Sequence, residues 1–462
     1  MVKVMKEYEK SSGIDEAVCI ENNTVHYSKI SEQLLSEQEK ALHQQGFKYG
    51  HLIAVYCRQN VLFHPLVMVL QRIASEILFL NENSVKQVAD ILSISYFITD
   101  TKVDDGKAFG YEKTEVTVWG RRLYLYTKSD KEFADQEVKD NNRSCLFMTS
   151  GTTGAPDIVY KKVSVLEKEG RIIAERLRYT KEEHILVIAP PYHAYCNAYA
   201  CFAPAYSGAS VTYMGNIATK QSILRNMQKE QYTVIISTPF YFDQLLDAEQ
   251  LALLRLRVCS GGALTGRMKK SKIRFHNAYG STETGAICIE LYENGGSNED
   301  VGSEYSDVKV FFGGEKGKAH EGCISVETGH LMFKRIRNGK VEYISGTEWA
   351  LNDIGYRDLC GNIVVMGRND SVVNIGGEKV SLREVEEKIC EIPNIKEAKA
   401  KAEADKNNNT YIIAYISLID QSKATDVRKE LIPVLPVSKI PRKVVIKKSL
   451  ARTSTGKIKE NQ

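Results

Sequence analysis

The segment LFMTSGTTGAPD, residues 146–157, joins an apolar run to a loop that is rich in glycine and hydroxyl side chains. The glycines allow backbone N–H groups to converge on an anion, and the hydroxyls add further donors. The loop lacks the G-x-x-x-x-G-K-[ST] spacing of a P-loop. It therefore predicts a phosphate-binding loop of another kind, with an ordinary turn between strands as the alternative. The residues concerned are Thr149, Ser150, Gly151, Thr152, Thr153 and Gly154.

A second segment, NAYGSTETGA at 277–286, places an aromatic ring, hydroxyls and a carboxylate within a few residues. Tyr279 could stack on a nucleobase, and Thr282 could donate to a phosphate. Glu283 could bind Mg²⁺, a hard cation that prefers oxygen ligands and binds together with phosphates. Taken alone, the segment also fits a strand-to-helix turn.

Short apolar runs alternate with helical-period segments through the middle of the chain. Strands are expected at 184–190, 233–237 and 256–262, with helices at 218–231 and 240–254 between them. This alternation predicts an α/β fold with parallel strands. The polar, glycine-rich stretch 292–321 is expected to form exposed connections.

The pattern restarts as a small α+β unit after GRND, residues 367–370. Strands are expected at 372–375, 410–418 and 443–449, and a helix near 424–435. Another helix is predicted to begin at Ser381, because Ser381 and Glu384 have the S-x-x-E spacing of a capping box. We expect a large domain, 1–368, of parallel and mixed sheets with flanking helices, and a small mobile domain, 369–462.

The composition excludes several classes of protein. The 462 residues contain 62 Lys and Arg against 58 Asp and Glu, so the net charge of +4 does not predict a nucleic-acid partner. The ten cysteines show no CxxC pair or close-set framework and are read as reduced thiols. No apolar run is long enough to span a membrane, and the start lacks a signal-peptide core. A cytoplasmic location is therefore expected.

Eight motifs occur in the order typical of adenylate-forming enzymes, and the chain is identified as a member of that superfamily. The superfamily contains acyl- and aryl-CoA synthetases, adenylation domains of nonribosomal peptide synthetases, and luciferases. The resemblance extends continuously from 146 to 457. The motifs are TSGTTGAP, PPYHAY (190–195), SGGA (260–263), YGSTE (279–283), NDIGY at Asp353, GRND, NIGGEKVSLREVE (374–386) and TSTGK (453–457).

The resemblance implies ATP and Mg²⁺ as ligands and assigns a role to each matching residue. The loop from Thr149 to Gly154 would hold the β- and γ-phosphates of ATP, Thr282 the α-phosphate and Glu283 the metal ion. Asp353 would accept the ribose hydroxyls, helped by Arg368. The adenine pocket would be formed by Gly261, Gly262, Ala263, Asn277 and Tyr279. Gly280 and Ser281 are further positions of the nucleotide site.

Three further roles concern catalysis and motion. Lys457 is implied as the catalytic lysine that bridges the carboxylate and the α-phosphate, where charge gathers in the transition state. His193 is implied to guard the acyl pocket. Asp370 is implied as the hinge about which the small domain rotates between adenylation and thioester formation.

Two positions depart from the family pattern. The phosphate loop usually continues Pro-Lys-Gly, but here Asp157 follows Pro156. An anion in place of a phosphate-facing cation predicts weaker ATP binding unless Lys161 or Lys162 substitutes. Asn374 stands near the place of a common lysine, which puts the contact to the thiol donor in question.

The acyl-pocket motif favours an aromatic or medium-length acid as substrate. Ala194 follows His193, where amino-acid-activating members have an aspartate, so an α-amino acid is not expected. Tyr195 and Asn197 are candidate polar contacts in a largely apolar pocket. The expected acceptor is CoA, and a carrier-protein phosphopantetheine is the alternative. A second alternative is a non-catalytic protein that binds ATP or an acyl adenylate.

Overall fold

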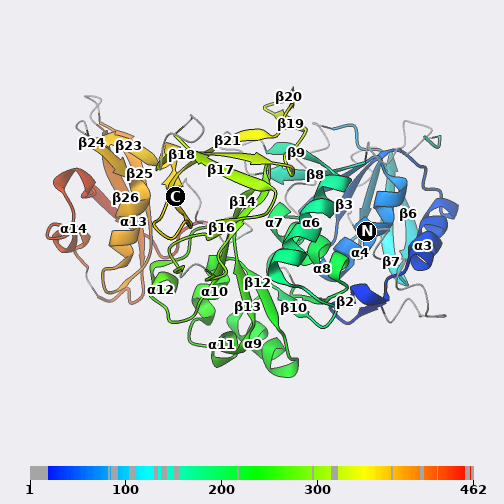
Figure 1. The fold of residues 1–462 in the computed structure, drawn as a ribbon, viewed down its shortest axis with the longest axis horizontal. Coiled ribbons are helices and arrows are strands. Elements are labelled where there is room, and N and C mark those ends of the chain that lie inside the picture. Colours follow the sequence, from blue (N-terminus) through cyan, green and yellow to red (C-terminus); the bar gives the residue numbers. More distant parts are fainter. Residues whose placement is uncertain are drawn as a thin grey trace.

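Two large mixed sheets, a four-stranded sheet and a small C-terminal unit make up the described part of the chain (Figure 1). The structure is a computed structural model. It describes residues 19–81, 84, 92–102, 111–128, 134–136, 143–149, 156–215, 218–293, 296–313, 321–375, 378–405, 410–423, 425–452 and 458.

The first large sheet contains the parallel strands expected from the sequence. Strands β10, β12 and β13 pair in parallel, as predicted for an α/β fold. The described strands follow the order β1 (Ile20–Glu21), β2 (Thr24–His26), β11 (Ser210–Tyr213), β10 (His184–Val187), β12 (Val234–Ser237), β13 (Leu256–Cys259), β14 (His276–Ser281), β15 (Gly285–Ile289) and β16 (Ser303–Glu304).

The second large sheet carries the strand that leads into the phosphate loop. Strand β8 pairs in parallel with β4 and antiparallel with β9. In the described residues the order is β20 (Lys340–Tyr343), β19 (Lys334–Arg337), β9 (Asp157–Lys162), β8 (Ser144–Thr149), β4 (Glu76–Phe79), β3 (Leu52–Tyr56), β5 (Tyr96–Thr99), β7 (Arg121–Lys128) and β6 (Tyr111–Val118).

Helices cover these sheets, and α6 lies between them. The described helices are α3 (Glu32–Gln44), α4 (Asn60–Ile73), α6 (Val163–Leu177), α7 (Ala194–Asn197), the π-helical segment η5 (Ala198–Phe202), α8 (Ala203–Ser207), α9 (Lys220–Lys229), α10 (Pro239–Leu245), α11 (Glu249–Leu253) and α12 (Gly266–Lys269). The single helix expected at 240–254 is two helices, because the helical conformation is interrupted between Leu245 and Glu249.

The stretch 292–321 is not only exposed connections, and that prediction was wrong in part. Its described residues include β16 and β17 (Val308–Phe312), and Tyr305, Val310 and Phe312 are buried. Strand β17 begins the four-stranded sheet, which continues with β18 (Glu321–Thr328), β21 (Glu348–Arg357) and β22 (Ile363–Arg368).

The C-terminal unit has its own hydrophobic core, formed by residues between Val380 and Leu435. The domain boundary after Arg368 stays a prediction. The described elements are η6 (Asn369–Ser371), β23 (Val372–Ile375), β24 (Glu378–Ser381), α13 (Leu382–Cys390), β25 (Ile395–Ala404), β26 (Thr410–Leu418), α14 (Val427–Leu431), η7 (Val437–Lys439) and β27 (Lys443–Ile446). This α+β unit beside the large mixed sheets confirms the predicted fold class.

The start of α13 is capped by Ser381, as predicted, but in a different way. The Ser381 hydroxyl accepts from Glu384 N–H at 3.3 Å. The Glu384 carboxylate binds Lys439 instead of the cap backbone, with both Nζ–O distances 2.7 Å. Only half of the capping box therefore forms.

Among the described helices, none is long and apolar enough to cross a membrane.

A buried ion pair joins the two large sheets. Lys161, on β9, places its Nζ 3.2 Å from a carboxylate oxygen of Glu169 on α6, and both side chains are at most 3% exposed. The other Glu169 oxygen accepts from the N–H of Ala286 on β15 at 2.8 Å. Residue 285 has to be glycine, because φ is +74° and a Cβ would lie 2.6 Å from the Glu169 carboxylate.

Replacing Glu169 with alanine is expected to destabilise the protein by about 3–5 kcal/mol, since it leaves the Lys161 ammonium buried without a counter-ion. Thermal unfolding followed by circular dichroism measures the loss. The double variant Lys161→Met/Glu169→Met should unfold at a higher temperature than Glu169→Ala. Arg171→Ala is the matched control, because it breaks an exposed pair on the same helix. Equal melting of Glu169→Ala and Arg171→Ala would contradict this account.

Candidate active site

A cavity of about 1430 Å³ opens where the two large sheets, the four-stranded sheet and the C-terminal unit meet. Most of the residues singled out in the sequence line it, although they come from segments far apart in the chain. These are Thr149, His193, Tyr195, Gly261, Gly262, Ala263, Asn277, Tyr279, Gly280, Ser281, Thr282, Glu283, Asp353 and Arg368.

Of the remaining predicted residues, only the side chain of Asn197 is among those that the structure describes. Ser150, Gly151, Thr152, Thr153, Gly154 and Lys457 lie outside the described residues, as does the side chain of Asp370. Asn197 is described but is fully buried behind the wall. Its amide donates to the Pro191 carbonyl at 3.3 Å, so its predicted contact with a substrate finds no support in this geometry.

Thr282 and Glu283 lie at the tip of a hairpin, not in a strand-to-helix turn. Strands β14 and β15 pair antiparallel, with Ser281 opposite Gly285. The turn is closed by Thr284, whose N–H donates to the Ser281 hydroxyl at 3.2 Å. Gly280 is required because a Cβ there would lie 2.3 Å from the Gly285 carbonyl oxygen. The backbone thus holds a hydroxyl and a carboxylate side by side at the cavity.

Tyr279 and Asp353 form a hydrogen-bonded pair on the cavity wall. The Tyr279 hydroxyl donates to an Asp353 oxygen at 2.6 Å and links β14 to β21. Burial, and then the neighbouring Asp353 carboxylate, raise the pKa of Tyr279 well above its usual value, so the phenol stays protonated. Arg368 lies opposite Asp353 in the β21–β22 ladder. This wall offers an aromatic ring, a carboxylate and a guanidinium to one ligand.

The turn after β13 supplies the glycine-rich part of the wall. Gly261 has φ +84°, a conformation that favours glycine. Nearby, the Asn277 amide donates to the Asp300 carbonyl at 3.0 Å, which fixes the start of β14. Gly261, Gly262 and Ala263 line the same cavity as Tyr279.

Small and aromatic side chains form the part of the wall on α7 and η5. Tyr195 donates to the Ser237 carbonyl at 2.8 Å, and burial raises its pKa well above the usual value. The His193 ring lies beside the Tyr192 ring, with centroids 4.6 Å apart and the ring planes tilted by 52°. The small residues that line this region are Ala194 on α7, Ala198 on η5, and Ala278 and Ala286 on the neighbouring strands β14 and β15.

Asp157 does not face the cavity as an unpaired anion. Its carboxylate accepts from Arg337 Nε at 2.7 Å, and both residues line the cavity. Lys161 is bound to Glu169, and Lys162 lies over the Phe333 ring at 4.2 Å. Arg337 belongs to none of the sequence motifs. The signal that could have found it is the alternation of Arg335 and Arg337 on one face of a short strand.

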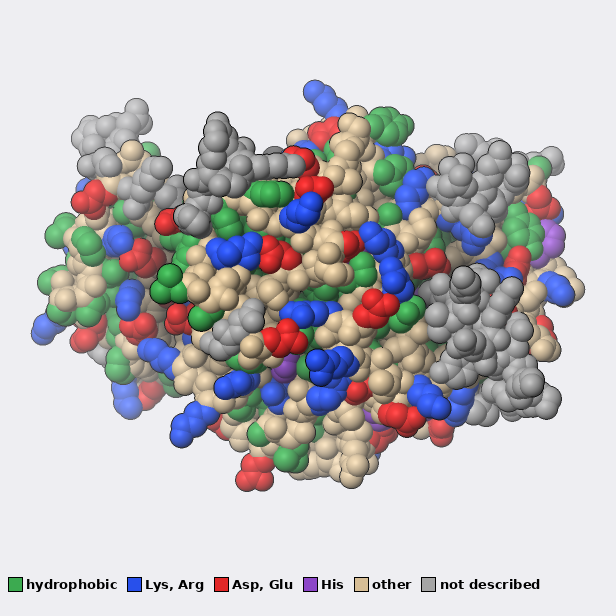
Figure 2. Space-filling model, viewed as in Figure 1, with side chains coloured by type: hydrophobic (Ala, Val, Ile, Leu, Met, Phe, Trp, Pro, Cys, Tyr) green, Lys and Arg blue, Asp and Glu red, His purple; other side chains and the backbone are tan. Residues whose placement is uncertain are grey.

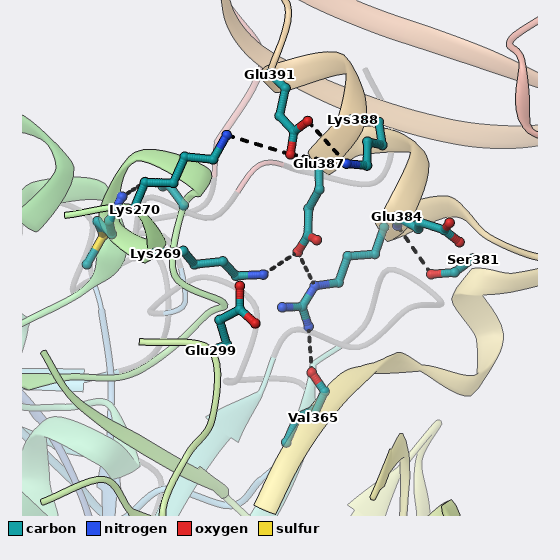
Figure 3. Close-up of polar contacts among 12 residues, drawn as sticks. Lys269, Lys270, Glu299, Val365, Ser381, Glu384, Glu387, Lys388 and Glu391 are labelled. Carbon is teal, nitrogen blue, oxygen red and sulfur yellow. Dashed lines mark hydrogen bonds and ion pairs between the residues drawn. The ribbon is translucent and has the colours of Figure 1, made fainter. Parts of the chain in front are cut away.

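Ion pairs connect the C-terminal unit to the rest of the molecule in this orientation (Figure 3). Glu387 on α13 accepts from Lys269 on α12 at 2.9 Å and from Arg383 at 3.1 Å. Arg383 also donates to the Val365 carbonyl on β22 at 3.2 Å. Although burial raises the pKa of Glu387, the bond to Lys269 and the charge of Arg383 lower it below its usual value. We call Lys269, Arg383 and Glu387 the interdomain clasp.

The C-terminal unit also contributes to the cavity wall. Arg383, Glu386, Lys399 and Arg452 line the cavity. Arg452 lies over the Phe240 ring of α10 at 4.5 Å and pairs with Glu397 at 2.6 Å. Strands β23 and β24 lie at the outer edge of the unit, away from β14 (Figure 1).

The donor set suits a metal ion that arrives with a phosphate ligand. Glu283 is the carboxylate at the hairpin tip, and no group of three His, Cys, Asp or Glu side chains that could hold a metal occurs in the described residues. Mg²⁺ commonly binds through one or two carboxylates together with substrate phosphates and water. Glu283 and Thr282 fit that pattern.

The face of the molecule drawn in Figure 2 carries charges of both signs. Figure 2 shows Lys and Arg side chains interspersed with Asp and Glu across the visible face. Such mixing differs from the one-sign stripe of a nucleic-acid interface.

Comparison with known proteins identifies a matching family and fold. Residues 40–314, more than half of the chain, match the family model described as AMP-binding enzyme. The chain is similar to the medium-chain fatty-acid–CoA ligase of Escherichia coli, with 26% identity over 69% of this chain and 60% of the ligase. It is also similar to the 3,4-dihydroxybenzoate–[aryl-carrier protein] ligase of Bacillus anthracis, with 22% identity over 68% of this chain and 72% of that protein.

The fold matches solved structures over almost the whole chain. The o-succinylbenzoate CoA synthetase of Bacillus subtilis, in complex with an acyl-adenylate intermediate, superposes with a TM-score of 0.74 and 18% identity. The match covers 93% of this chain and 91% of that structure.

Proposed function

Because the chain belongs to the family of AMP-binding enzymes, we propose that it uses ATP to activate a carboxylic acid and then transfers the acyl group to a thiol. The acid's carboxylate oxygen attacks the α-phosphorus and forms an acyl adenylate, and pyrophosphate leaves. The thiol sulfur then attacks the acyl carbonyl, and AMP leaves. The observation that carries the proposal is the convergence of the hairpin tip, the Tyr279–Asp353 pair and the start of the phosphate loop on one cavity.

The nucleoside part of ATP fits the wall formed by β13, β14 and β21. Tyr279 offers its ring to adenine, and the glycine-rich turn at 261–263 leaves room on the other side. Asp353 accepts from the two ribose hydroxyls, since a carboxylate has about four lone-pair sites and Tyr279 occupies one. Arg368 donates to the same sugar.

The phosphates fit the region between Thr149 and the hairpin tip. Thr149 ends β8 at the cavity, and Thr282 donates to the α-phosphate. When bound, Mg²⁺ held by Glu283 would neutralise phosphate charge. Lys457 is proposed to bridge the two anions that must approach each other, because donors placed where charge develops lower the barrier most.

The acid fits between α7, η5 and the hairpin. The small side chains there leave width for an aromatic ring or a medium-length chain. Glu169 lines this region, but its charge is compensated by Lys161, so it offers no counter-ion for a substrate ammonium. With Ala194 at the wall, this supports an aromatic or medium-length acid over an amino acid. His193 is proposed to close the pocket near the carboxylate.

The proposed acceptor is CoA, and a carrier-protein phosphopantetheine is the alternative. Relatives with names of both kinds are similar to this chain. Asn374 lies opposite Lys379 in the β23–β24 ladder. The segment GGEKV (376–380) falls within this part of the chain. Both kinds of ligase share it, so it does not distinguish CoA from a carrier protein as the acceptor.

ATP–pyrophosphate exchange across a panel of aryl, medium-chain acyl and amino acids tests the proposal. Exchange is expected with one or more aryl or medium-chain acids, and thioester is expected when CoA is added. Thioester that forms only with a carrier protein would favour the alternative acceptor. Exchange with none of the acids would contradict the proposal and favour a non-catalytic nucleotide-binding protein.

Lys457→Ala is expected to lower exchange at least about a hundredfold while MgATP affinity stays largely unchanged, because the lost contact is made mainly in the transition state. Exchange rates and calorimetric ATP binding measure the two effects. Lys448→Ala removes an exposed lysine of the same unit and should leave both unchanged. Near-normal exchange in Lys457→Ala would contradict the assignment.

The second step requires the C-terminal unit to move. In this orientation Arg452 lines the cavity, whereas none of the described side chains of β23 and β24 is among its lining residues. Bringing the β23–β24 hairpin to the cavity would break the interdomain clasp. Surface ion pairs contribute about 0–1 kcal/mol each, so the clasp can hold one state without preventing the other.

Asp370→Pro is expected to preserve adenylation while thioester formation falls by orders of magnitude, since proline fixes φ and also restricts Asn369. Pyrophosphate release and thioester formation, measured separately on one preparation, distinguish the half-reactions. Asp370→Ala keeps a flexible backbone and should retain both. Equal loss of the two steps in the proline variant would count against the hinge.

A further inference from the structure

Asp157 is the residue that least fits a phosphate site, because it is an anion. In the structure, however, a neighbouring cation compensates its charge. It begins β9, directly opposite Thr149 in the β8–β9 ladder. Its side chain is only 5% exposed. A buried carboxylate at this place requires a partner, because an uncompensated buried charge is strongly unfavourable.

The partner is Arg337, and the sheet register dictates the pairing. Strand β19 pairs antiparallel with β9, with Ile336 opposite Ile158, so the next position on β19 lies beside Asp157. Arg337 Nε donates to Asp157 Oδ2 at 2.7 Å. Asp157 raises the pKa of Arg337, helped by the charges of Glu342 and Glu283, so the guanidinium is always charged.

Arg337 remains accessible to a ligand. Half of its side chain is exposed, and it lines the cavity together with Thr149 and Glu283. A guanidinium carries five N–H donors in a rigid fork. The bond to Asp157 uses the Nε donor and thereby sets the plane in which the others lie.

The hairpin tip is tied to the segment that leads into β19. The Glu283 carbonyl accepts from Met332 N–H at 2.8 Å. Two residues after Met332, β19 begins. Glu283 and Arg337 are therefore held by one continuous stretch of backbone, on the side of the cavity where Thr149 enters the phosphate loop.

We propose that Arg337, oriented by Asp157, supplies the cation for the β- and γ-phosphates of ATP in this protein. Asp157 is then a positioning residue. This inference rests on the proposed function, since it presumes a nucleotide in the cavity. It explains how a phosphate site can contain an anion where the family pattern has a lysine. The Asp157 carboxylate holds the Arg337 guanidinium of the neighbouring strand β19 at the cavity.

Calorimetric titration with MgATP and with AMP, in the absence of any acid, tests the inference. Arg337→Gln should weaken MgATP binding about ten- to a hundredfold, the effect of losing charge-assisted hydrogen bonds, and leave AMP binding within about twofold. AMP lacks the β- and γ-phosphates, so its binding also reports that the site is intact. Lys340→Gln removes one charge from the exposed end of the same β-hairpin and should change neither affinity.

Substitution of Asp157 tests the proposal by whether MgATP affinity falls or rises. If Asp157 orients Arg337, Asp157→Asn weakens MgATP binding by about threefold or more. If Asp157 merely repels phosphate, the same change tightens it, which would overturn the proposal. The double variant Asp157→Lys/Arg337→Gln should bind MgATP more tightly than Arg337→Gln alone, since it returns a cation to β9.

The outcomes separate this inference from the proposed function. Wild-type protein that binds MgATP and AMP, with no selective loss of MgATP affinity in Arg337→Gln, contradicts the role of Arg337 alone. Wild-type protein that binds neither nucleotide contradicts the role of Arg337 and the proposed function together.

Discussion

The carboxylate of Glu169 is the contact on which the geometry of the cavity depends. It lies on the helix between the two large sheets, with the Lys161 ammonium from one sheet on one oxygen and the Ala286 N–H from the other sheet on the second. Gly285 permits the close approach. Since breaking a buried pair costs about 3–5 kcal/mol, the two sheets are fixed relative to each other. Thr149 and the hairpin tip come from different sheets, so their separation depends on this contact, together with the bond from Met332 N–H to the Glu283 carbonyl.

Charge compensation is the second theme of the site. Asp157 is paired with Arg337, Glu169 with Lys161, and Glu387 with Lys269. In each case a residue of one element neutralises a residue of another, so the ion pairs also position backbone. Because Asp157 stands where the family pattern has a lysine, the cation on this side of the cavity comes from Arg337 on β19. The interdomain clasp holds the C-terminal unit against α12 (Figure 3).

The sequence predicted the elements whose pattern is local. The strand at 410–418 and the parallel run from β10 to β13 were found because apolar runs and turn residues mark them. Strand β25 was missed, since its alternating Ala, Lys and Glu residues are also good helix formers. Among the described residues of the hydroxyl, glycine and carboxylate motifs, Thr149, Gly261, Thr282, Glu283 and Asp353 line one cavity, and their roles stay predictions. Arg337 and Glu169 could not be recognised from the sequence, because their roles arise from strand register and from burial between the sheets. Asn197 has a polar side chain of the type that was sought for the acyl pocket, but that side chain is fully buried.

The central claim is that the acid's carboxylate attacks the α-phosphorus of ATP in this cavity. The most direct measurement supplies the acid that supports exchange with both carboxylate oxygens labelled as ¹⁸O, together with ATP, Mg²⁺ and the thiol acceptor. Mass spectrometry then follows the label among the products. The account predicts one ¹⁸O in the phosphate of AMP, because the thiol attacks the carbonyl carbon and leaves the bridging oxygen on phosphorus. Unlabelled AMP, or ADP with the label in inorganic phosphate, would contradict it.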